Sequence, residues 1–114
     1  MKFEIEARVE RPGGFVLEVR ETLEAETLGL VGPSGSGKST LLDAVAGIEP
    51  GARVVLDGID CTRLPLEKRG IGYVTQDALL FPHRTLRENL LYSPRATELG
   101  NVPDALGIAP LLDR

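Results

Sequence analysis

A glycine-rich stretch is the feature that most constrains what this sequence can fold into. The stretch VGPSGSGKST occupies residues 31–40 and holds three glycines in ten residues. Glycine weakens helices and strands because it loses more conformational freedom on folding than any other residue. The stretch is therefore predicted to be a loop whose glycines serve a purpose other than stability.

The segments on either side of the loop give it a structural context. The apolar run TLGLVG, residues 27–32, predicts a strand that enters the loop. Apolar residues then recur at helical spacing as far as Ile48, where Gly47 and Pro50 indicate the end of a helix. A strand, a glycine loop and a helix in this order predict an α/β protein of the P-loop NTPase type.

The loop matches the phosphate-binding pattern G-x-x-x-x-G-K-[ST]. Backbone N–H groups that lead into a helix N-terminus offer many donors to a nucleoside triphosphate. Lys38 would reach the β- and γ-phosphates, and the Ser39 hydroxyl would complete the coordination of Mg²⁺. The predicted nucleotide-binding residues are Gly32, Pro33, Ser34, Gly35, Ser36, Gly37, Lys38, Ser39 and Thr40.

The loop alone leaves more than one class of protein open. GPSGSGKST also resembles the loop of nucleoside monophosphate kinases, which transfer a phosphate to a nucleotide such as GMP or AMP. Such a kinase is expected to carry an Arg-rich monophosphate site soon after the first helix, and none is visible. A non-catalytic nucleotide-binding or interaction fragment is a second alternative.

Further elements follow from alternation and turn signals. Apolar and charged residues alternate on both sides of Pro12-Gly13-Gly14, which predicts an antiparallel hairpin at the N-terminus. The other predicted elements are strands at 53–56, closed by the turn Asp57-Gly58, and at 71–76, with short helices at 65–69, from Thr85 through Leu91 before Ser93-Pro94, and after Asn101.

The segment IGYVTQDALLFPHRTLRENLLY, residues 71–92, resembles the glutamine-loop region of the ATP-binding subunits of ABC transporters. In that family a strand ends in Gln, and an LFPH segment leads to a helix that contains EN. Upstream, GIEPGARVVLDGIDCTRLPLEKRGIGYV resembles the same family, and the closing ALGIAPLLDR is most similar to importer ATPases of the molybdate and related oxyanion group. Residues 1–114 are therefore expected to be the N-terminal part of a single ABC-type ATP-binding domain.

The resemblance implies the ATP-binding portion of an ABC importer ATPase, which couples ATP binding and hydrolysis to the uptake of a solute such as molybdate. It implies ATP and Mg²⁺ as cofactors, Lys38 and Gln76 as catalytic residues, and Ser39 and Gln76 as metal contacts. The implied partners are a second copy of the ATP-binding subunit and a transmembrane permease subunit, which would meet the surface carrying Phe81, Pro82 and His83.

Family members continue into an LSGGQ signature, a magnesium-holding Asp, a catalytic Glu and a switch histidine, and none of these is present in the 114 residues. The fold is therefore expected to be incomplete, and the predicted strand at 27–31 to be left with unpaired backbone groups. Whether these residues alone form an enzyme is left open, whereas the full-length parent is expected to be an ABC-type ATPase.

Charge and hydropathy limit the partners. A net charge of −4 and a pI near 5.0 argue against a nucleic-acid surface, which needs clustered Lys and Arg. No run approaches the roughly 18 consecutive apolar residues of a membrane span, and MKFEIEARVE lacks the apolar run of a signal peptide. The expected location is the cytoplasm, peripheral at the inner face of the plasma membrane, without direct insertion.

Three single residues have both a functional and a structural interpretation. Phe15 is the nearest candidate for the aromatic residue that stacks on adenine in the family, yet its alternation with Leu17 and Val19 favours the core. His83 is expected to be a solvated loop residue, because no second metal ligand is spaced near it. Cys61, the single cysteine, is expected to be a small loop or buried residue.

Overall fold

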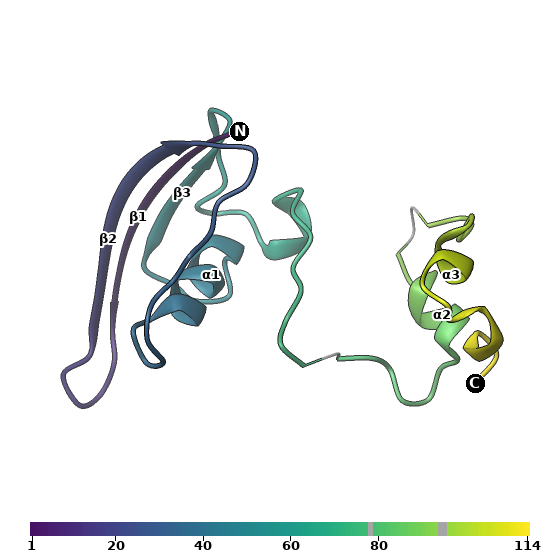
Figure 1. The fold of residues 1–114 in the computed structure, drawn as a ribbon. Coiled ribbons are helices and arrows are strands. Elements are labelled where there is room, and N and C mark those ends of the chain that lie inside the picture. The colour runs from purple at the N-terminus through teal and green to yellow at the C-terminus, as the bar shows by residue number, and fades with distance from the viewer. Residues whose placement is uncertain (78, 94–95) are drawn as a thin grey trace. The chain divides into compact units, whose positions relative to one another are not determined.

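A computed structural model describes residues 1–77, 79–93 and 96–114. These residues form two compact units, Met1–Tyr73 and Val74–Arg114. The elements are β1 (Lys2–Glu10), β2 (Val16–Glu24), α1 (Lys38–Ala46), β3 (Ala52–Leu56), β4 (Ile59–Asp60), the 3₁₀ helix η1 (Leu66–Lys68), α2 (Leu86–Leu90), α3 (Val102–Ala105) and the 3₁₀ helix η2 (Ala109–Leu111) (Figure 1). None of the helices among the described residues has the length and apolar character that crossing a membrane requires.

The first unit contains a four-stranded antiparallel sheet with the strand order β2-β1-β3-β4. The predicted N-terminal hairpin is confirmed, with Ala7 of β1 opposite Val19 of β2. The predicted turn at Asp57-Gly58 is also confirmed, and it joins β3 to β4. Both of its residues have positive φ, 48° and 80°, as a two-residue hairpin turn of type I′ requires.

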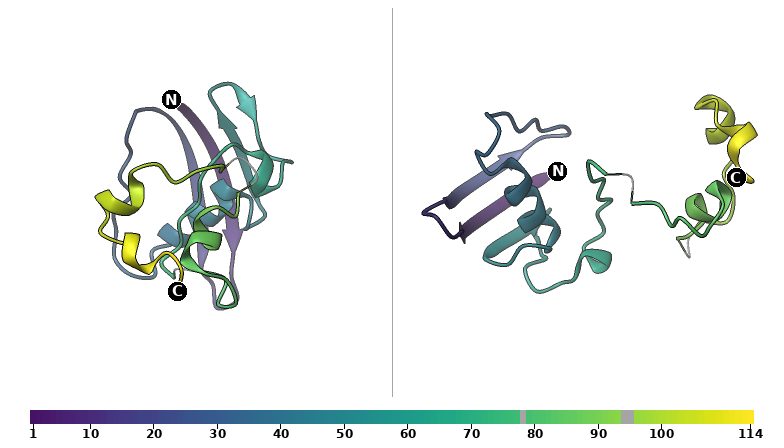
Figure 2. Two further views of the ribbon diagram at one scale, coloured as in Figure 1. Left: turned by 90° about the vertical axis from the view of Figure 1, so that its right-hand side faces the viewer. Right: turned by 90° about the horizontal axis from the view of Figure 1, so that it is seen from below.

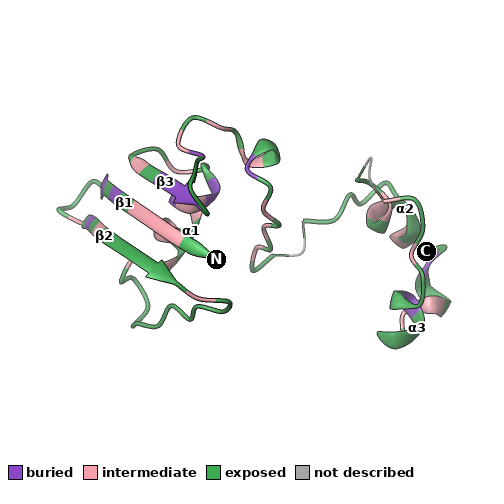
Figure 3. Ribbon diagram, turned by 90° about the horizontal axis from the view of Figure 1, so that it is seen from above, coloured by how far each residue is buried: buried purple, intermediate pink, exposed green. Residues whose placement is uncertain are grey.

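The two faces of the sheet differ because neighbouring side chains on a strand point to opposite sides. On one face Val54 and Leu56 of β3 pack with Val45 of α1, and α1 covers this face (Figure 1 and Figure 2). Figure 3 shows β3 largely buried and the edge strand β2 largely exposed. Cys61 is 2% exposed and belongs to this core, in agreement with its structural interpretation.

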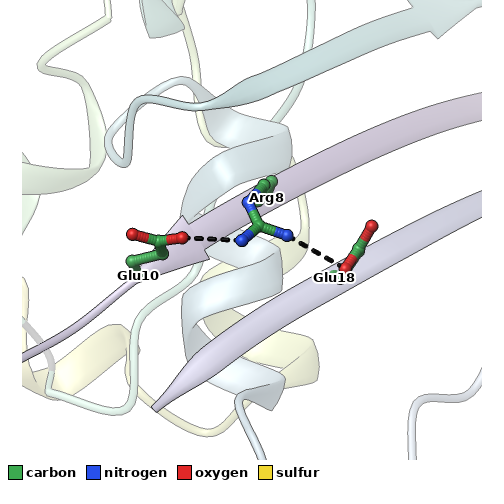
Figure 4. A network of polar contacts seen from close by, with 3 residues as sticks. All are labelled: Arg8, Glu10 and Glu18. Carbon is green, nitrogen blue, oxygen red and sulfur yellow. Dashed lines mark hydrogen bonds and ion pairs between the residues drawn. The ribbon is translucent and has the colours of Figure 1, made fainter. Parts of the chain in front are cut away.

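The other face of the sheet carries charged side chains in water. Arg8 lies between two carboxylates, with Nη2 at 2.7 Å from Glu10 Oε1 and Nη1 at 3.1 Å from Glu18 Oε2 (Figure 4). These interactions raise the pKa of Arg8 above its ordinary value. Exposed ion pairs of this kind add little to stability. The main effect of these charged side chains is that this face of the sheet stays in contact with water.

Two predicted strands are wrong. Residues 27–32 and 71–76 have no regular secondary structure. An apolar run becomes a strand only where a neighbouring strand pairs with its backbone, and the described sheet consists of β1–β4 alone. The run before the phosphate loop is accordingly exposed, with Leu28 at 53% and Val31 at 94%.

The second unit consists of short helices held by side-chain and backbone caps. The predicted capping box of α2 is confirmed: Glu88 N–H donates to Thr85 Oγ1, and Thr85 N–H donates to the Glu88 carboxylate. The C-terminal segment returns to the start of this helix, where Leu86 N–H donates to the Arg114 carbonyl at 3.0 Å. The short helices predicted after Asn101 are present as α3 and η2, and Pro94 lies outside the described residues.

Candidate phosphate-binding site

The backbone of the glycine loop needs its glycines. Gly35 and Gly37 have φ values of 80° and 100°, in the left-handed region that favours glycine. Between them Ser36 N–H donates to the Pro33 carbonyl at 3.2 Å and closes a tight turn. At Gly32 a Cβ would come within 2.9 Å of Ser36 Oγ, so a side chain there would displace the Ser36 hydroxyl.

At the start of α1, the first backbone N–H groups have no acceptor among the described residues. The first helical bond that crosses its N-terminus runs from Leu41 N–H to the Gly37 carbonyl, at 2.9 Å. The N–H groups of Lys38, Ser39 and Thr40 precede this bond, and no helical carbonyl is available to them. Gly37 is the N-cap and offers no side-chain acceptor. Free N–H groups and the positive end of the helix dipole therefore meet at the end of the loop.

Lys38 is folded back over the loop that precedes it. Its Nζ donates to the Gly32 carbonyl at 2.5 Å and to the Pro33 carbonyl at 2.9 Å. The structure thus brings together the first glycine and the lysine of the pattern, six residues apart. The ammonium group lies beside the turn, where a phosphate oxygen could replace a carbonyl oxygen as its acceptor.

The loop packs on the start of β2. A Cβ at Gly37 would lie 3.0 Å from Phe15 Cζ and 3.1 Å from Leu17 Cδ1. The Phe15 ring is half-buried beneath this glycine, which agrees with its interpretation as a packing residue. A close approach of the loop backbone to these two side chains explains why position 37 has no side chain of its own.

The donor set fits a nucleotide phosphate group together with Mg²⁺. The loop and the first turn of α1 carry an ammonium group, three unpaired N–H groups and the exposed Ser39 hydroxyl, and that turn has no acidic residue. Donors and positive charge without a carboxylate suit an anion. A hydroxyl supplies one hard oxygen, and Mg²⁺ takes its remaining ligands from phosphate and water.

Gln76, the other predicted catalytic residue, belongs to the second unit. It is exposed and lies in a segment without regular structure, beside a hydrogen bond that Thr75 Oγ1 donates to the Asp77 carbonyl. Its role in contacting Mg²⁺ or water stays a prediction.

An aromatic cluster forms around the predicted partner surface of the second unit. The rings of Phe81 and Tyr92 lie 4.6 Å apart and those of Phe81 and His83 5.8 Å apart, measured between centroids. The guanidinium carbon of Arg84 lies 5.8 Å from the Phe81 centroid and 5.6 Å from the Tyr92 centroid. His83 is exposed, as expected, and it takes part in this cluster.

Asn89 holds the loop that carries this cluster, and the sequence interpretation missed it. Its Oδ1 accepts from Phe81 N–H at 2.8 Å, and its Nδ2 donates to the carbonyls of Phe81 and Thr85 at 3.2 and 2.9 Å. The available signal was the EN pair after the capping-box threonine. In that pair, Glu88 caps the helix and Asn89 fixes the preceding loop.

Arg69 is a second residue that the sequence did not single out. It is 9% exposed, and its guanidinium donates to the carbonyls of Leu64, Val45 and Thr62 at 2.7, 2.9 and 3.2 Å. Val45 belongs to the last turn of α1, where a cation is favoured by the helix dipole. The sequence predicted only a short surface helix at residues 65–69, so nothing local revealed this burial.

Comparison with known proteins identifies relatives over most of the chain. Residues 19–114 match the family described as ABC transporter.

The chain is 42% identical over 113 residues to a molybdate/tungstate import ATP-binding protein of Archaeoglobus fulgidus, covering 91% of this chain and 47% of that protein. It is 42% identical over 120 residues to a molybdenum import ATP-binding protein of Rhodopseudomonas palustris, covering 91% of this chain and 32% of that protein. It is 44% identical over 91 residues to an Fe(3+) ions import ATP-binding protein of Streptomyces coelicolor, covering 78% of this chain and 26% of that protein. The chain thus spans less than half the length of these relatives.

Proposed function

This chain belongs to the ABC transporter family, and from that premise we propose that it is the ATP-binding portion of an importer ATPase. The observation that carries the proposal is the loop at residues 32–40, where Lys38 and the unpaired N–H groups of α1 converge. The relatives named as import ATP-binding proteins support the importer class. Membership of this family decides against the nucleoside monophosphate kinase alternative.

The loop residues perform binding and charge compensation. The N–H groups of Lys38, Ser39 and Thr40 donate to phosphate oxygens, and the Lys38 ammonium compensates the charge of the β- and γ-phosphates. The glycines keep side chains away from the phosphates, so the backbone can approach closely. Because the loop is held by its own turn and by Phe15 beneath Gly37, these donors are positioned before the ligand arrives.

Ser39 and Gln76 are the proposed metal contacts. When bound, Mg²⁺ supplies positive charge that stabilises the phosphates during attack by water. Ser39 offers its hydroxyl oxygen from the first turn of α1. Gln76 offers a side-chain amide, which can accept through its oxygen and donate through its nitrogen, and so can orient a water molecule.

The proposed partners are a permease subunit and a second copy of the ATP-binding subunit. The aromatic cluster of Phe81, His83 and Tyr92 with Arg84 is the surface we assign to the permease, because exposed aromatic and Arg side chains are enriched in protein interfaces. The bonds of Asn89 fix the loop beneath it. The proposed location is the cytoplasmic face of the membrane, reached through the permease.

The proposed solute is molybdate or a related oxyanion. Two of the relatives described above are named for molybdate, tungstate or molybdenum import, and a third is named for Fe(3+) import. Solute selectivity belongs to other subunits of an importer, so binding experiments on this chain do not report the solute. Growth on limiting molybdate after deletion of the gene tests this part of the proposal, and unchanged growth would contradict it.

Titration calorimetry with Mg-ATP tests nucleotide binding. Lys38→Ala removes a charge-assisted contact of about 1.5–3 kcal/mol, which corresponds to an affinity loss of roughly tenfold to 150-fold. Lys68→Ala is the matched control, because Lys68 is an exposed lysine of η1 outside the loop. Equal affinities for the unaltered chain and Lys38→Ala would contradict the proposed role of the loop.

A further inference from the structure

A pocket at the end of α1 takes no part in the function proposed above. It has a volume of about 770 Å³, and its walls are residues 47–53, between α1 and β3, and residues 62–65, between β4 and η1. Ala44 and Arg69 complete the lining, and all of these residues lie in the first unit. The phosphate loop precedes α1 and this pocket lies where α1 ends, so a helix of nine residues, about 13 Å long, separates the two sites.

Three arginines line this pocket, which we call the arginine pocket. Arg69 is 9% exposed, whereas Arg53 and Arg63 are exposed. Each nitrogen of the Arg69 guanidinium donates to one carbonyl, at 2.7, 2.9 and 3.2 Å. Both terminal nitrogens of a guanidinium carry two N–H groups, so Nη1 and Nη2 each keep a further donor beyond these bonds. A buried cation that can still donate therefore lies beside two exposed cations.

The carboxylates near the arginine pocket do not balance its positive charge. Glu49 belongs to the lining, and it is paired with Arg11 at 2.8 Å. Asp60 is the other neighbouring carboxylate, and its pKa is lowered mainly by hydrogen bonds with Thr62, with smaller contributions from the charges of the two exposed arginines. Four arginines and two carboxylates leave an excess of two positive charges, on a chain whose net charge is −4.

The rest of the lining indicates which kind of anion fits. Ile48, Leu64 and Pro65 form an apolar part of the wall, and Ile48 is 54% exposed. A pocket of this volume takes a small organic molecule rather than a bare ion. A phosphate monoester carries a charge of about −1.5 to −2 at pH 7, which matches the excess positive charge better than a single carboxylate does.

We propose that the arginine pocket binds a small phosphate monoester. Its phosphate group accepts hydrogen bonds from Arg53, Arg63 and Arg69, because the planar guanidinium fork matches the oxygens of a phosphate. Its organic part lies on the apolar wall formed by Ile48 and Leu64. The inference goes beyond the proposed function and does not rest on it, since the pocket shares no residue with the phosphate loop.

The test is an NMR titration of the ¹⁵N-labelled 114-residue chain with phenyl phosphate and, separately, with inorganic phosphate, at constant ionic strength. We expect saturable shifts of the amide signals of Gly47, Arg63 and Leu64. Phenyl phosphate should bind about threefold to tenfold more tightly than inorganic phosphate, because its ring covers part of the apolar wall.

Two variants of exposed residues test the arginines without removing the buried Arg69. Arg53→Gln and Arg63→Gln should each weaken the binding of phenyl phosphate about threefold to tenfold, since an exposed charge-assisted contact is partly screened by water. Arg20→Gln is the matched control, because Arg20 is an exposed arginine of β2 outside the pocket, and it should stay within about twofold. Far-ultraviolet circular dichroism verifies that each variant is folded.

The titration separates this inference from the proposed function. Shifts confined to residues 32–40 that disappear in Lys38→Ala would overturn the inference and leave nucleotide binding at the loop standing. Equal affinities for Arg63→Gln and Arg20→Gln would overturn it as well, as would equal shifts with sodium acetate, which would mean an adventitious ion only. If Mg-ATP does not bind while phenyl phosphate titrates the arginine pocket as expected, the proposed function fails and the inference stands.

Discussion

Replacing Arg69 by Met should destabilise the first unit more than any change of an exposed arginine. The Arg69 guanidinium is 9% exposed and donates to three backbone carbonyls, those of Leu64, Val45 and Thr62. Its side chain also lies against Gly47, where a Cβ would come within 2.6 Å of Nη2. Methionine keeps the unbranched apolar stem and lacks the guanidinium, so the substitution removes the charge, its hydrogen bonds and the packing of the planar group against Gly47.

The expected loss in the free energy of unfolding follows from these bonds. A buried carbonyl left without a donor costs about 1–3 kcal/mol, and three such groups set an upper range of about 3–9 kcal/mol. Removing the cation also removes the cost of burying it, which is several kcal/mol. We expect a net loss of about 2–4 kcal/mol, a large part of the roughly 4–11 kcal/mol typical for a unit of this size.

Urea unfolding followed by circular dichroism measures this loss. Arg53→Met is the matched control: Arg53 is exposed on β3, and its replacement should stay within about 0.5 kcal/mol. Arg69→Lys should lie between the two, because lysine keeps the charge and lacks the planar fork that reaches several carbonyls. Equal unfolding free energies for Arg69→Met and Arg53→Met would refute the assignment of Arg69 as the anchor of the end of α1.

Two further predictions concern the loop and its activity. Gly37→Ala should lower the free energy of unfolding by about 1–3 kcal/mol, because the φ of Gly37 is 100°, and further because the new Cβ would lie 3.0 Å from Phe15 Cζ. Gly35→Ala places its Cβ in open space and should cost less, as measured by urea unfolding. Equal losses for the two variants would contradict the packing of the loop on β2. The 114-residue chain should bind Mg-ATP without sustained hydrolysis, because Lys38, Ser39 and Gln76 supply only part of the charge compensation and water orientation that attack requires. A phosphate-release assay measures this, and steady turnover that Lys38→Ala abolishes would show that these residues suffice.

The features that sequence alone determined are those whose signals lie within a few residues. The hairpin follows from strict alternation around Pro12-Gly13-Gly14, and the β3–β4 turn follows from Asp57-Gly58, whose residues tolerate positive φ. The spacing of Thr85 and Glu88 determined the start of α2. In the loop at 31–40, glycine spacing and the flanking helix predicted a phosphate-binding loop, because backbone conformation there depends on local residue type, whereas the family was indicated by the resemblance over residues 71–92.

Tertiary structure decided whatever depends on distant neighbours. Residues 27–32 and 71–76 read as strands, yet a strand needs a partner for its backbone groups, and the described sheet pairs β1–β4 only. The burial of Arg69, 24 residues from Val45 in sequence, and the contact of Tyr73 with Asp43 likewise depend on how the chain returns to α1. No local pattern encodes such contacts, because the free energy of burying a polar side chain depends on which carbonyls or carboxylates the fold brings to it.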